Sequence, residues 1–525
     1  MMRRLCFCIA ATILTLFRAD ISLAQVDNPP AVTAPPNVLA SEGILLQVLV
    51  SVTDPDGDPI LSLTASPLPA GAAFTTAAGN TSGTLSWQPS YQQAGTYGIV
   101  FTAANSQTGT DTTVIEVADT RTQANDPYGA RLECGVSAAT GELALAAPPN
   151  PVLGGPMPLG FDLYYASLLG RTARYRSALG ENWRGTYDWR LFVAGSTAEV
   201  EDHLGATYKF VSVGGVWSLS EPTDYPHQLV AIGPELVFKH GESLFLYFFD
   251  TASGRLTKVQ DLPGNQHTLT YDLSGGTLEQ VSDAFGRTLT FSYDRTGLLT
   301  QWSDGIRAAT LAYTGNLLSS YTDAAGKTTN FTYAVSHPIP GLLTSVQDPD
   351  GAVPYQYSYD SAGRVTTAMN AKSASFGLSY LDPEQTDVSN SEGGNNSFVH
   401  KLPGRLLRHE DAAGGITTWT YDTQGRVTDV SRVGSGLLHV AYDPASGYPS
   451  AITYPGGAQI QFAYVAKSRV PGVVWHRLAT QTAPDLTQIQ LDYDANGNVT
   501  QVTDEALHSW RFIRNARGQP TQVSN

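Results

Sequence analysis

The chain has 525 residues and a formal net charge of −16, and only 15% of its residues are charged. Glycine (50) and proline (31) are abundant and tyrosine (25) outnumbers phenylalanine (18), a turn-rich and aromatic composition that favours extended β-structure. The negative charge argues against nucleic-acid binding, because such affinity depends on Lys and Arg at phosphates. At this length, two or more domains are expected.

Residues 1–24 have the pattern of a secretory signal peptide. Two arginines precede an apolar run over residues 5–17, and a small-residue cleavage pattern ends at Ala24. The run is shorter than the ~20 residues that span a membrane. We therefore expect a secreted bacterial protein, extracellular or on the cell surface, with no membrane span in the mature chain; anchoring by this run is the alternative. Cys134 is then the only remaining cysteine, and we expect it to be a buried small hydrophobe.

Residues 25–40 are rich in proline and polar, which predicts a linker. Across residues 41–118, short alternating segments separated by turns predict a small β-sandwich. Strands are expected at residues 44–52, 60–64, 84–87, 96–103 and 112–117. The motifs Asp54-Pro-Asp-Gly-Asp58-Pro and Leu85-Ser-Trp87-Gln-Pro89 make this stretch resemble the bacterial immunoglobulin-like and cadherin-like modules of secreted proteins.

Asp54, Asp56 and Asp58 alternate across a turn that contains glycine. Their carboxylates could converge on a calcium ion, which prefers oxygen ligands. A Pro-Asp-Gly turn explains the same residues without a metal, because Pro55 fixes φ and Gly57 accepts a positive φ. Both interpretations stay open, and calcium is the only cofactor that the sequence suggests.

After a second predicted linker, residues 119–134, the composition changes again. Residues 135–240 contain aromatic motifs such as Phe161-Asp-Leu-Tyr-Tyr165 and Tyr187-Asp-Trp189-Arg-Leu191. A repeat then occupies residues 241–525. About thirteen times, an aromatic-ended strand is followed by a turn with glycine, mostly at a spacing of roughly 20 to 22 residues, which indicates stacked supersecondary units.

One tyrosine position recurs in the repeat and is expected to be structural. It is occupied by Tyr271, Tyr293, Tyr313, Tyr333, Tyr359, Tyr380, Tyr421, Tyr442, Tyr464 and Tyr493. Phe249, His400 and Arg514 hold the same position in other copies. The residue two positions earlier is always apolar, which predicts that one face of the sheet is buried.

The polar residues of the repeat have structural explanations. The Asp that follows many of the tyrosines is expected to be a turn residue rather than a catalytic carboxylate, because it recurs from copy to copy. The Arg after the turn glycine, as in Arg364 and Arg426, is expected to pair with a neighbouring Asp in the stack. His400 is expected to be a tolerated substitute for tyrosine rather than a ligand.

The Tyr-Asp pairs, the Gly-Arg turns and the period make residues 135–525 resemble the RHS/YD-repeat family, with residues 135–240 similar to its lead-in segment. The resemblance implies an all-β fold in which a long antiparallel sheet of YD repeats is wound as a spiral or partial shell after the small N-terminal β-sandwich. Many members carry a self-cleaving core motif and a toxin domain after the array, and we find neither in this sequence.

No catalytic motif is visible, so we do not expect an enzyme; action on extracellular polysaccharide is the weakest of three hypotheses. The leading hypothesis is a secreted scaffold or binding protein, adhesive or in contact with glycans or cell-surface components. The second is the shell portion of a polymorphic toxin delivery system used in competition between bacteria. In either case a C-terminal partner or continuation could complete the array.

Overall fold

A computed structural model shows that the chain forms two compact units, Met1–Asp119 and Thr120–Asn525. The structure describes residues 27–41, 45–89, 93, 95–118, 131–147, 152–172, 174–243, 245–272, 276–382, 384–401, 405–515 and 517–525. The predicted signal peptide and most of the predicted linker at 119–134 lie outside these residues. Over the described ranges, no helix is both long and apolar enough to cross a membrane.

The first unit is a β-sandwich, as the sequence predicts. Its strands are β1 (Ala31–Thr33), β2 (Asn37–Ser41), β3 (Leu46–Thr53), β4 (Ser62–Ser66), β5 (Ala73–Thr76), β6 (Ser82–Trp87), β7 (Gly95–Ala104) and β8 (Thr108–Ala118), with a 3-10 turn at Ala78–Asn80. Two four-stranded sheets have the orders β1-β3-β6-β5 and β2-β8-β7-β4. Val50, Leu85, Trp87, Ile99 and Phe101 are among the residues of the core between them.

The prediction that residues 25–40 are a linker is wrong. Strand β1 pairs antiparallel with β3, and β2 pairs parallel with β8, so this stretch supplies one edge of each sheet. Proline suggested a linker because it cannot donate a ladder hydrogen bond, but edge strands tolerate it. All four prolines of the stretch also lie outside the two strands.

The second unit begins with small sheets formed by the lead-in segment. Its elements are β9 (Ala144–Ala146), β10 (Leu163–Ala166), α1 (Leu169–Thr172), β11 (Trp183–Gly185), β12 (Arg190–Ala194), β13 (Thr197–Glu201), β14 (Thr207–Val213) and β15 (Val216–Glu221). Strands β9 to β11 form a three-stranded sheet and β12 to β15 a four-stranded antiparallel one.

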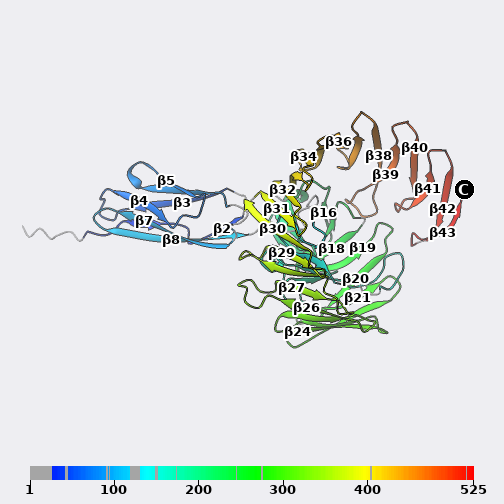
Figure 1. Ribbon diagram of the computed structural model, residues 1–525, viewed down its shortest axis with the longest axis horizontal. Helices are drawn as coiled ribbons and strands as arrows, with labels where there is room; N and C mark the ends of the chain where they lie inside the picture. Colours follow the sequence, from blue (N-terminus) through cyan, green and yellow to red (C-terminus); the bar gives the residue numbers. More distant parts are fainter. Residues whose placement is uncertain are drawn as a thin grey trace, which may run out of the picture. The chain divides into compact units, whose positions relative to one another are not determined.

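A 28-stranded antiparallel sheet, in which each strand pairs with the next in sequence, follows and confirms the predicted array (Figure 1). It starts at Gln228, inside the range assigned to the lead-in segment. Its strands are β16 (Gln228–Ile232), β17 (Glu235–Lys239), β18 (Leu246–Asp250), β19 (Leu256–Gln260), β20 (Gln266–Tyr271), β21 (Leu278–Asp283), β22 (Thr288–Tyr293), β23 (Leu299–Ser303), β24 (Ala308–Thr314), β25 (Leu317–Thr322), β26 (Thr328–Tyr333), β27 (Leu343–Gln347), β28 (Tyr355–Tyr359), β29 (Val365–Asn370), β30 (Ser375–Asp382), β31 (Gln385–Asn390), β32 (Asn395–Lys401), β33 (Arg405–Glu410), β34 (Ile416–Tyr421), β35 (Val427–Arg432), β36 (Gly436–Tyr442), β37 (Pro449–Thr453), β38 (Gln459–Lys467), β39 (Trp475–Thr482), β40 (Gln488–Tyr493), β41 (Val499–Thr503), β42 (Ser509–Arg514) and β43 (Pro520–Ser524).

Each repeat consists of two strands, a bulge and two tight turns. The ladder register shifts just before the repeated tyrosine, as between Ser292 and Tyr293, and such a bulge increases the local twist. In the turn after Tyr359, the Asp360 carboxylate accepts hydrogen bonds from the backbone of Ala362 and Arg364. Gly363 there has a φ of 80°, which favours glycine. The Asp is thus a turn residue, as its recurrence indicates.

The lead-in segment packs against one face of the large sheet and forms the main core with it. Phe161 lies edge-on to Phe291 at 5.1 Å between ring centroids, and Trp183 meets Phe331 in the same way at 4.7 Å. Cys134 is buried in this core, as expected, and its backbone oxygen accepts a hydrogen bond from the Tyr357 hydroxyl. The lead-in segment therefore supplies the layer that buries the inner face of the first repeats.

The sheet winds far enough for late repeats to contact its first strands. The Gln228 side chain exchanges two hydrogen bonds with the backbone of Val474, 246 residues later. The Tyr448 hydroxyl donates to the backbone oxygen of Gly241, and Trp475 packs in a small apolar cluster with Phe248. These contacts make the sheet a spiral, and Figure 1 shows its strands curling from β16 round to β43.

Candidate functional site

The repeated tyrosines form a regular series of hydrogen bonds across the sheet. All ten donate their hydroxyl to a backbone oxygen 14 to 16 residues earlier, at distances of 2.5 to 2.8 Å. The pairs are Tyr271–Leu256, Tyr293–Leu278, Tyr313–Leu299, Tyr333–Leu318, Tyr359–Leu343, Tyr380–Val365, Tyr421–Leu406, Tyr442–Val427, Tyr464–Pro449 and Tyr493–Leu478. The tyrosine position therefore ties neighbouring repeats together as well as filling the core.

Several arginines stack on these tyrosine rings. The Arg364 guanidinium lies 4.2 Å from the ring centroid of Tyr380, and Arg426 lies 4.3 Å from that of Tyr442. Each also pairs with the Asp four residues earlier, Asp360 and Asp422 respectively. The expected pairing with a neighbouring Asp is thus confirmed, and the partner belongs to the same turn, because the tight loop brings positions i and i+4 together.

His400 holds the tyrosine position without making the tyrosine's hydrogen bond. The side chain is buried, and neither ring nitrogen has a hydrogen-bond partner in the described part of the chain. Burial lowers the pKa of this imidazole to about 4, so the ring is neutral at pH 7. Its nearest ring neighbour in the strand, Phe398, is stacked at 6.4 Å. No metal-binding group of three His, Cys, Asp or Glu residues occurs in the ranges that the structure covers.

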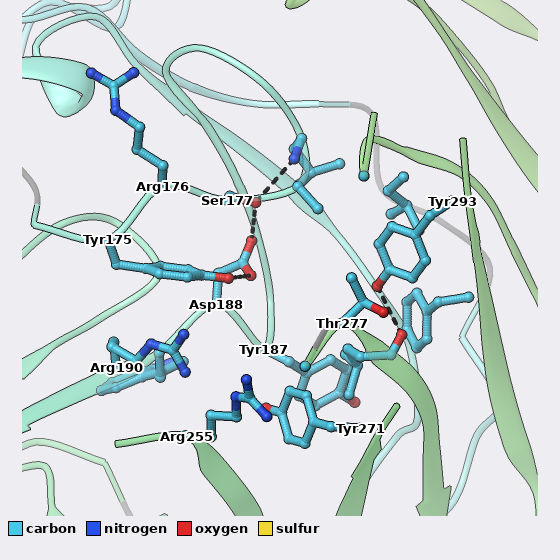
Figure 2. A pocket seen from close by; sticks show the side chains of 18 of the residues that line it. Tyr175, Arg176, Ser177, Tyr187, Asp188, Arg190, Arg255, Tyr271, Thr277 and Tyr293 are labelled. Atoms are coloured by element: carbon cyan, nitrogen blue, oxygen red, sulfur yellow. Dashed lines mark hydrogen bonds between the residues drawn. The ribbon is translucent and has the colours of Figure 1, made fainter. Parts of the chain in front are cut away.

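A pocket of about 310 Å³ opens between the lead-in segment and the first repeats (Figure 2). Tyr175 and Arg190 line it from the lead-in side. On the repeat side it is lined by Arg255, in the turn before β19, and by Tyr271 and Tyr293, at the ends of β20 and β22. Burial raises the pKa of all three tyrosines, which keeps their hydroxyls protonated. The pocket thus offers aromatic faces and cationic groups together.

The Asp188 carboxylate lies in the pocket wall but is occupied by its own loop. It accepts hydrogen bonds from the Ser177 hydroxyl at 2.6 Å and from the Tyr175 hydroxyl at 3.3 Å (Figure 2). The Gly185 backbone donates a third, at 2.7 Å. These bonds fix the loop that presents Tyr175. Asp188 is consequently a positioning residue of the pocket.

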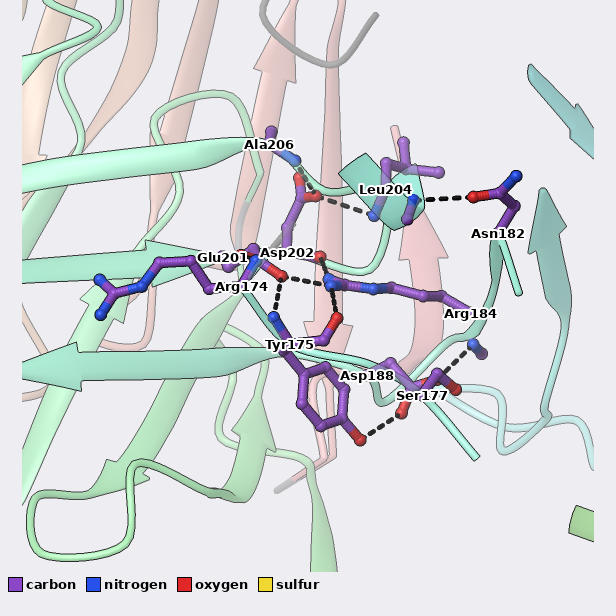
Figure 3. Close-up of polar contacts among 12 residues, drawn as sticks. Arg174, Tyr175, Ser177, Asn182, Arg184, Asp188, Glu201, Asp202, Leu204 and Ala206 are labelled. Carbon is purple, nitrogen blue, oxygen red and sulfur yellow. Dashed lines mark hydrogen bonds and ion pairs between the residues drawn. The ribbon is translucent and has the colours of Figure 1, made fainter. Parts of the chain in front are cut away.

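A buried ion pair supports the same loop from behind (Figure 3). Arg184 and Glu201 are both 1% exposed and are in direct contact. The Glu201 carboxylate also accepts backbone hydrogen bonds from Arg174 at 2.8 Å and Tyr175 at 3.3 Å. Arg184 donates to the backbone oxygens of Asp202 and Tyr175 as well. The pair therefore ties strand β13 to the segment that carries the pocket tyrosine.

The later repeats present a second feature, an apolar face that extends beyond Trp419, the last of its residues to pack against the main core in the described part of the chain. The register places Trp419 opposite Val430, Val440 opposite Ile452, and Leu491 opposite Val502. We call the apolar residues of this face in strands β34 to β43 the open face. Its residues are Trp419, Val430, Leu438, Val440, Ile452, Ile460, Phe462, Ile489, Leu491, Val502, Trp510 and Phe512, all half-buried. The matching residues under the lead-in segment, such as Phe291 and Phe331, are buried.

The three aspartates predicted as calcium ligands lie in the loop between β3 and β4. Asp54 accepts hydrogen bonds from the backbone of Asp56 and Asp58 and from the Asn105 side chain. Neighbouring carboxylates, including Asp27, contribute to a raised pKa of Asp58, after the first cause, burial. The bonds of Asp54 are those of an Asx turn. Calcium binding here stays a prediction, with Asp27 as an acidic neighbour that sequence reasoning assigned to the linker.

Sequence reasoning did not identify the pocket. Arg190 lies in the motif Tyr187-Asp-Trp189-Arg-Leu191, and Tyr271 and Tyr293 are repeat tyrosines, but nothing in the sequence places Arg190 beside Arg255. These two residues meet through an isolated antiparallel bridge. The open face was detectable as the apolar series two residues before each tyrosine position. The partial exposure of this face could not be predicted, because the sequence does not show how many repeats the lead-in segment covers.

Known families and structures resemble successive parts of the chain. A bacterial Ig domain family matches residues 27–118, a domain family of unknown function matches 133–210, the Teneurin YD-shell family matches 238–392, and the RHS repeat family matches 404–437. No curated protein sequence matches the chain.

Among solved structures, one of TcdB2-TccC3 is similar with a TM-score of 0.38 and 13% identity, over 86% of this chain and 29% of that one. A structure of TcdB2-TccC3 without its hypervariable C-terminal region has a TM-score of 0.37 and 12% identity, over 69% of this chain and 23% of that one. The SrpA adhesin from Streptococcus sanguinis has a TM-score of 0.17 and 11% identity, over 36% of this chain and 93% of that one. The chain thus spans less than a third of the TcdB2-TccC3 chains.

The family matches follow the order of the parts that the structure shows. The Ig domain match coincides with the β-sandwich, and the YD-shell and RHS matches fall within the 28-stranded sheet. The chain is therefore an RHS/YD-repeat protein with an N-terminal bacterial immunoglobulin-like domain.

Proposed function

We propose that this protein is a secreted, non-catalytic RHS scaffold that holds a second polypeptide on the open face. One observation carries the proposal: the inner face is buried under the lead-in segment along the first repeats, whereas beyond Trp419 its apolar residues are only half-buried and none packs against the main core among the described residues. Apolar faces of this extent are normally covered in soluble proteins. Secretion is supported by the signal-like pattern of residues 1–24.

A polypeptide suits the open face because a polypeptide already covers the neighbouring part. Along the first repeats, aromatic side chains of the lead-in segment, Phe161 and Trp183, meet Phe291 and Phe331. The open face repeats the same residue pattern with Trp419, Phe462 and Phe512. In a delivery system the held chain would be the cargo or a segment that completes the shell; in an adhesive role it would be a surface partner.

Co-expression with the product of an adjacent gene tests this proposal. We expect a stable complex in which the amides of β38 and β40 become protected from hydrogen exchange. The double substitution Phe462→Ser and Leu491→Ser should abolish the complex, because it removes apolar area from the open face. The matched control, Ala463→Ser and Gln490→Ser, changes the exposed opposite face of the same strands and should leave the complex intact.

Two outcomes would contradict the proposal. The first is that the two double variants bind the co-expressed chain equally well. The second is that no protein partner binds while an array of neutral glycans gives a signal that the open-face variant removes, which would make the open face a sugar-binding surface instead.

A further inference from the structure

Two arginines in the pocket lie directly opposite each other. Arg190 and Arg255 are partners in an isolated antiparallel bridge. Residues paired in this way project to the same side of the sheet, with Cβ atoms ~5 Å apart, and like charges at such a pair are destabilising. A negatively charged group between the two arginines would offset this repulsion.

Among the described residues, no carboxylate forms an ion pair with either arginine. Neither guanidinium has an ion-pair partner within 4.0 Å or a hydrogen-bond acceptor in the part of the chain that the structure covers, and the Arg255 Nε atom is buried without a partner. The carboxylate in the wall, Asp188, is engaged by Ser177, Gly185 and Tyr175. A second carboxylate, Asp250, interacts electrostatically with Arg255 at longer range and accepts hydrogen bonds from Ser253.

Aromatic rings hold both arginines in place at the pocket. The Arg190 guanidinium lies 4.7 Å from the ring centroid of Tyr175, and that of Arg255 lies 5.4 Å from the ring of Tyr271. In Figure 2 the two guanidinium groups lie one after the other between these rings. Stacking restricts the side chains but leaves their N–H groups free to donate, as a preformed carboxylate fork requires.

We propose that this pocket binds a carboxylate-bearing sugar, with Arg190 and Arg255 on the carboxylate and the tyrosine rings against the sugar ring. The volume of about 310 Å³ is at the lower end for small-molecule pockets and admits one or two sugar units. The Thr277 side chain in the wall provides a hydroxyl for the sugar's own hydroxyls. This site is separate from the open face and does not depend on the proposed scaffold role.

Calorimetric titration of the full chain with D-glucuronate tests the site, with D-glucose as the uncharged control. We expect glucuronate to bind and glucose to bind at least tenfold more weakly. Arg190→Met and Arg255→Met should each weaken glucuronate binding tenfold or more, because each removes charge-assisted hydrogen bonds. Arg432→Met, which removes an exposed arginine paired with Asp411, is the matched control and should not change binding.

Thermal melts show whether a variant that fails to bind glucuronate is still folded. Both pocket variants should melt at or above the temperature of the unmodified protein, because each relieves a repulsion, and glucuronate should raise the melting temperature of the unmodified protein only. The proposal is overturned if glucose binds as well as glucuronate, if glucuronate binding survives both substitutions, or if no glucuronate binds. It is also overturned if a short acidic peptide binds at the arginines in place of the sugar.

Discussion

Arg514 donates a 2.8 Å hydrogen bond from Nε to the backbone oxygen of Val499, fifteen residues earlier. In ten other repeats a tyrosine hydroxyl makes the equivalent bond, as Tyr493 does to Leu478. An arginine can thus replace the tyrosine at this repeat position when its side chain donates the same hydrogen bond. In most repeats this position therefore holds a long side chain that ends in a hydrogen-bond donor, whereas Phe249 and His400 fill it without that bond.

The first prediction compares two of these tyrosines. Tyr464→Phe removes one bond, to Pro449, and should lower the free energy of unfolding by about 1 kcal/mol. Tyr333→Phe should cost more, about 2 to 3 kcal/mol, because its hydroxyl also accepts a bond from the buried Trp183 side chain. Urea unfolding measures both. Equal losses would mean that the bond to Trp183 contributes nothing.

The second prediction separates the covered face from the open face. Phe331→Ala should lower stability by about 3 to 5 kcal/mol, because Phe331 is buried against Trp183. Trp419→Ala should lower the stability of the isolated protein by clearly less than Phe331→Ala does, because Trp419 is only half-buried. Denaturant titrations of the two variants provide the comparison. If Trp419→Ala cost as much as Phe331→Ala, the open face would be covered in solution.

The third prediction concerns the buried ion pair behind the pocket. Glu201→Gln should destabilise the protein by about 3 to 5 kcal/mol, because it leaves the Arg184 guanidinium buried without a counter-charge. The double variant Arg184→Met and Glu201→Leu should recover much of that loss. Thermal and urea unfolding of the single and double variants test the coupling. A double variant less stable than Glu201→Gln would contradict the argument.

The fourth prediction is a pH dependence that arises from His400. Its pKa falls from 6.5 in the unfolded chain to about 4 in the folded protein, because burial disfavours the cation. Between these values the unfolded state binds a proton that the folded state excludes, so stability decreases as the pH falls from about 6.5 to 4. This histidine accounts for up to about 3 kcal/mol of that loss.

His400→Phe should therefore flatten the dependence of unfolding free energy on pH in this window. Urea titrations at pH 5 and pH 7.5 give the difference for each variant. His508→Phe, at a side chain that is 71% exposed, controls for the loss of a histidine as such. An unchanged pH dependence in His400→Phe would show that the ring is solvated in solution.

The repeat and most of its local chemistry follow from the sequence alone. A tyrosine and an apolar residue two positions apart define the inner face, and the Asp and Gly define the turn, because these interactions are made within one repeat and its neighbour. The β-sandwich was predictable for the same reason. Its edge strands were missed, since prolines that mark a linker are also tolerated at a sheet edge.

Where the inner face is covered and where charges meet depends on the tertiary structure. Phe331 and Trp419 occupy equivalent positions, yet Phe331 is buried in the main core and Trp419, at the margin of that core, is only half-buried. Arg190 and Arg255 become neighbours through a bridge between segments 65 residues apart. Local periodicity fixes the strands and the direction of their side chains, whereas burial and convergence depend on long-range contacts that the winding of the sheet creates.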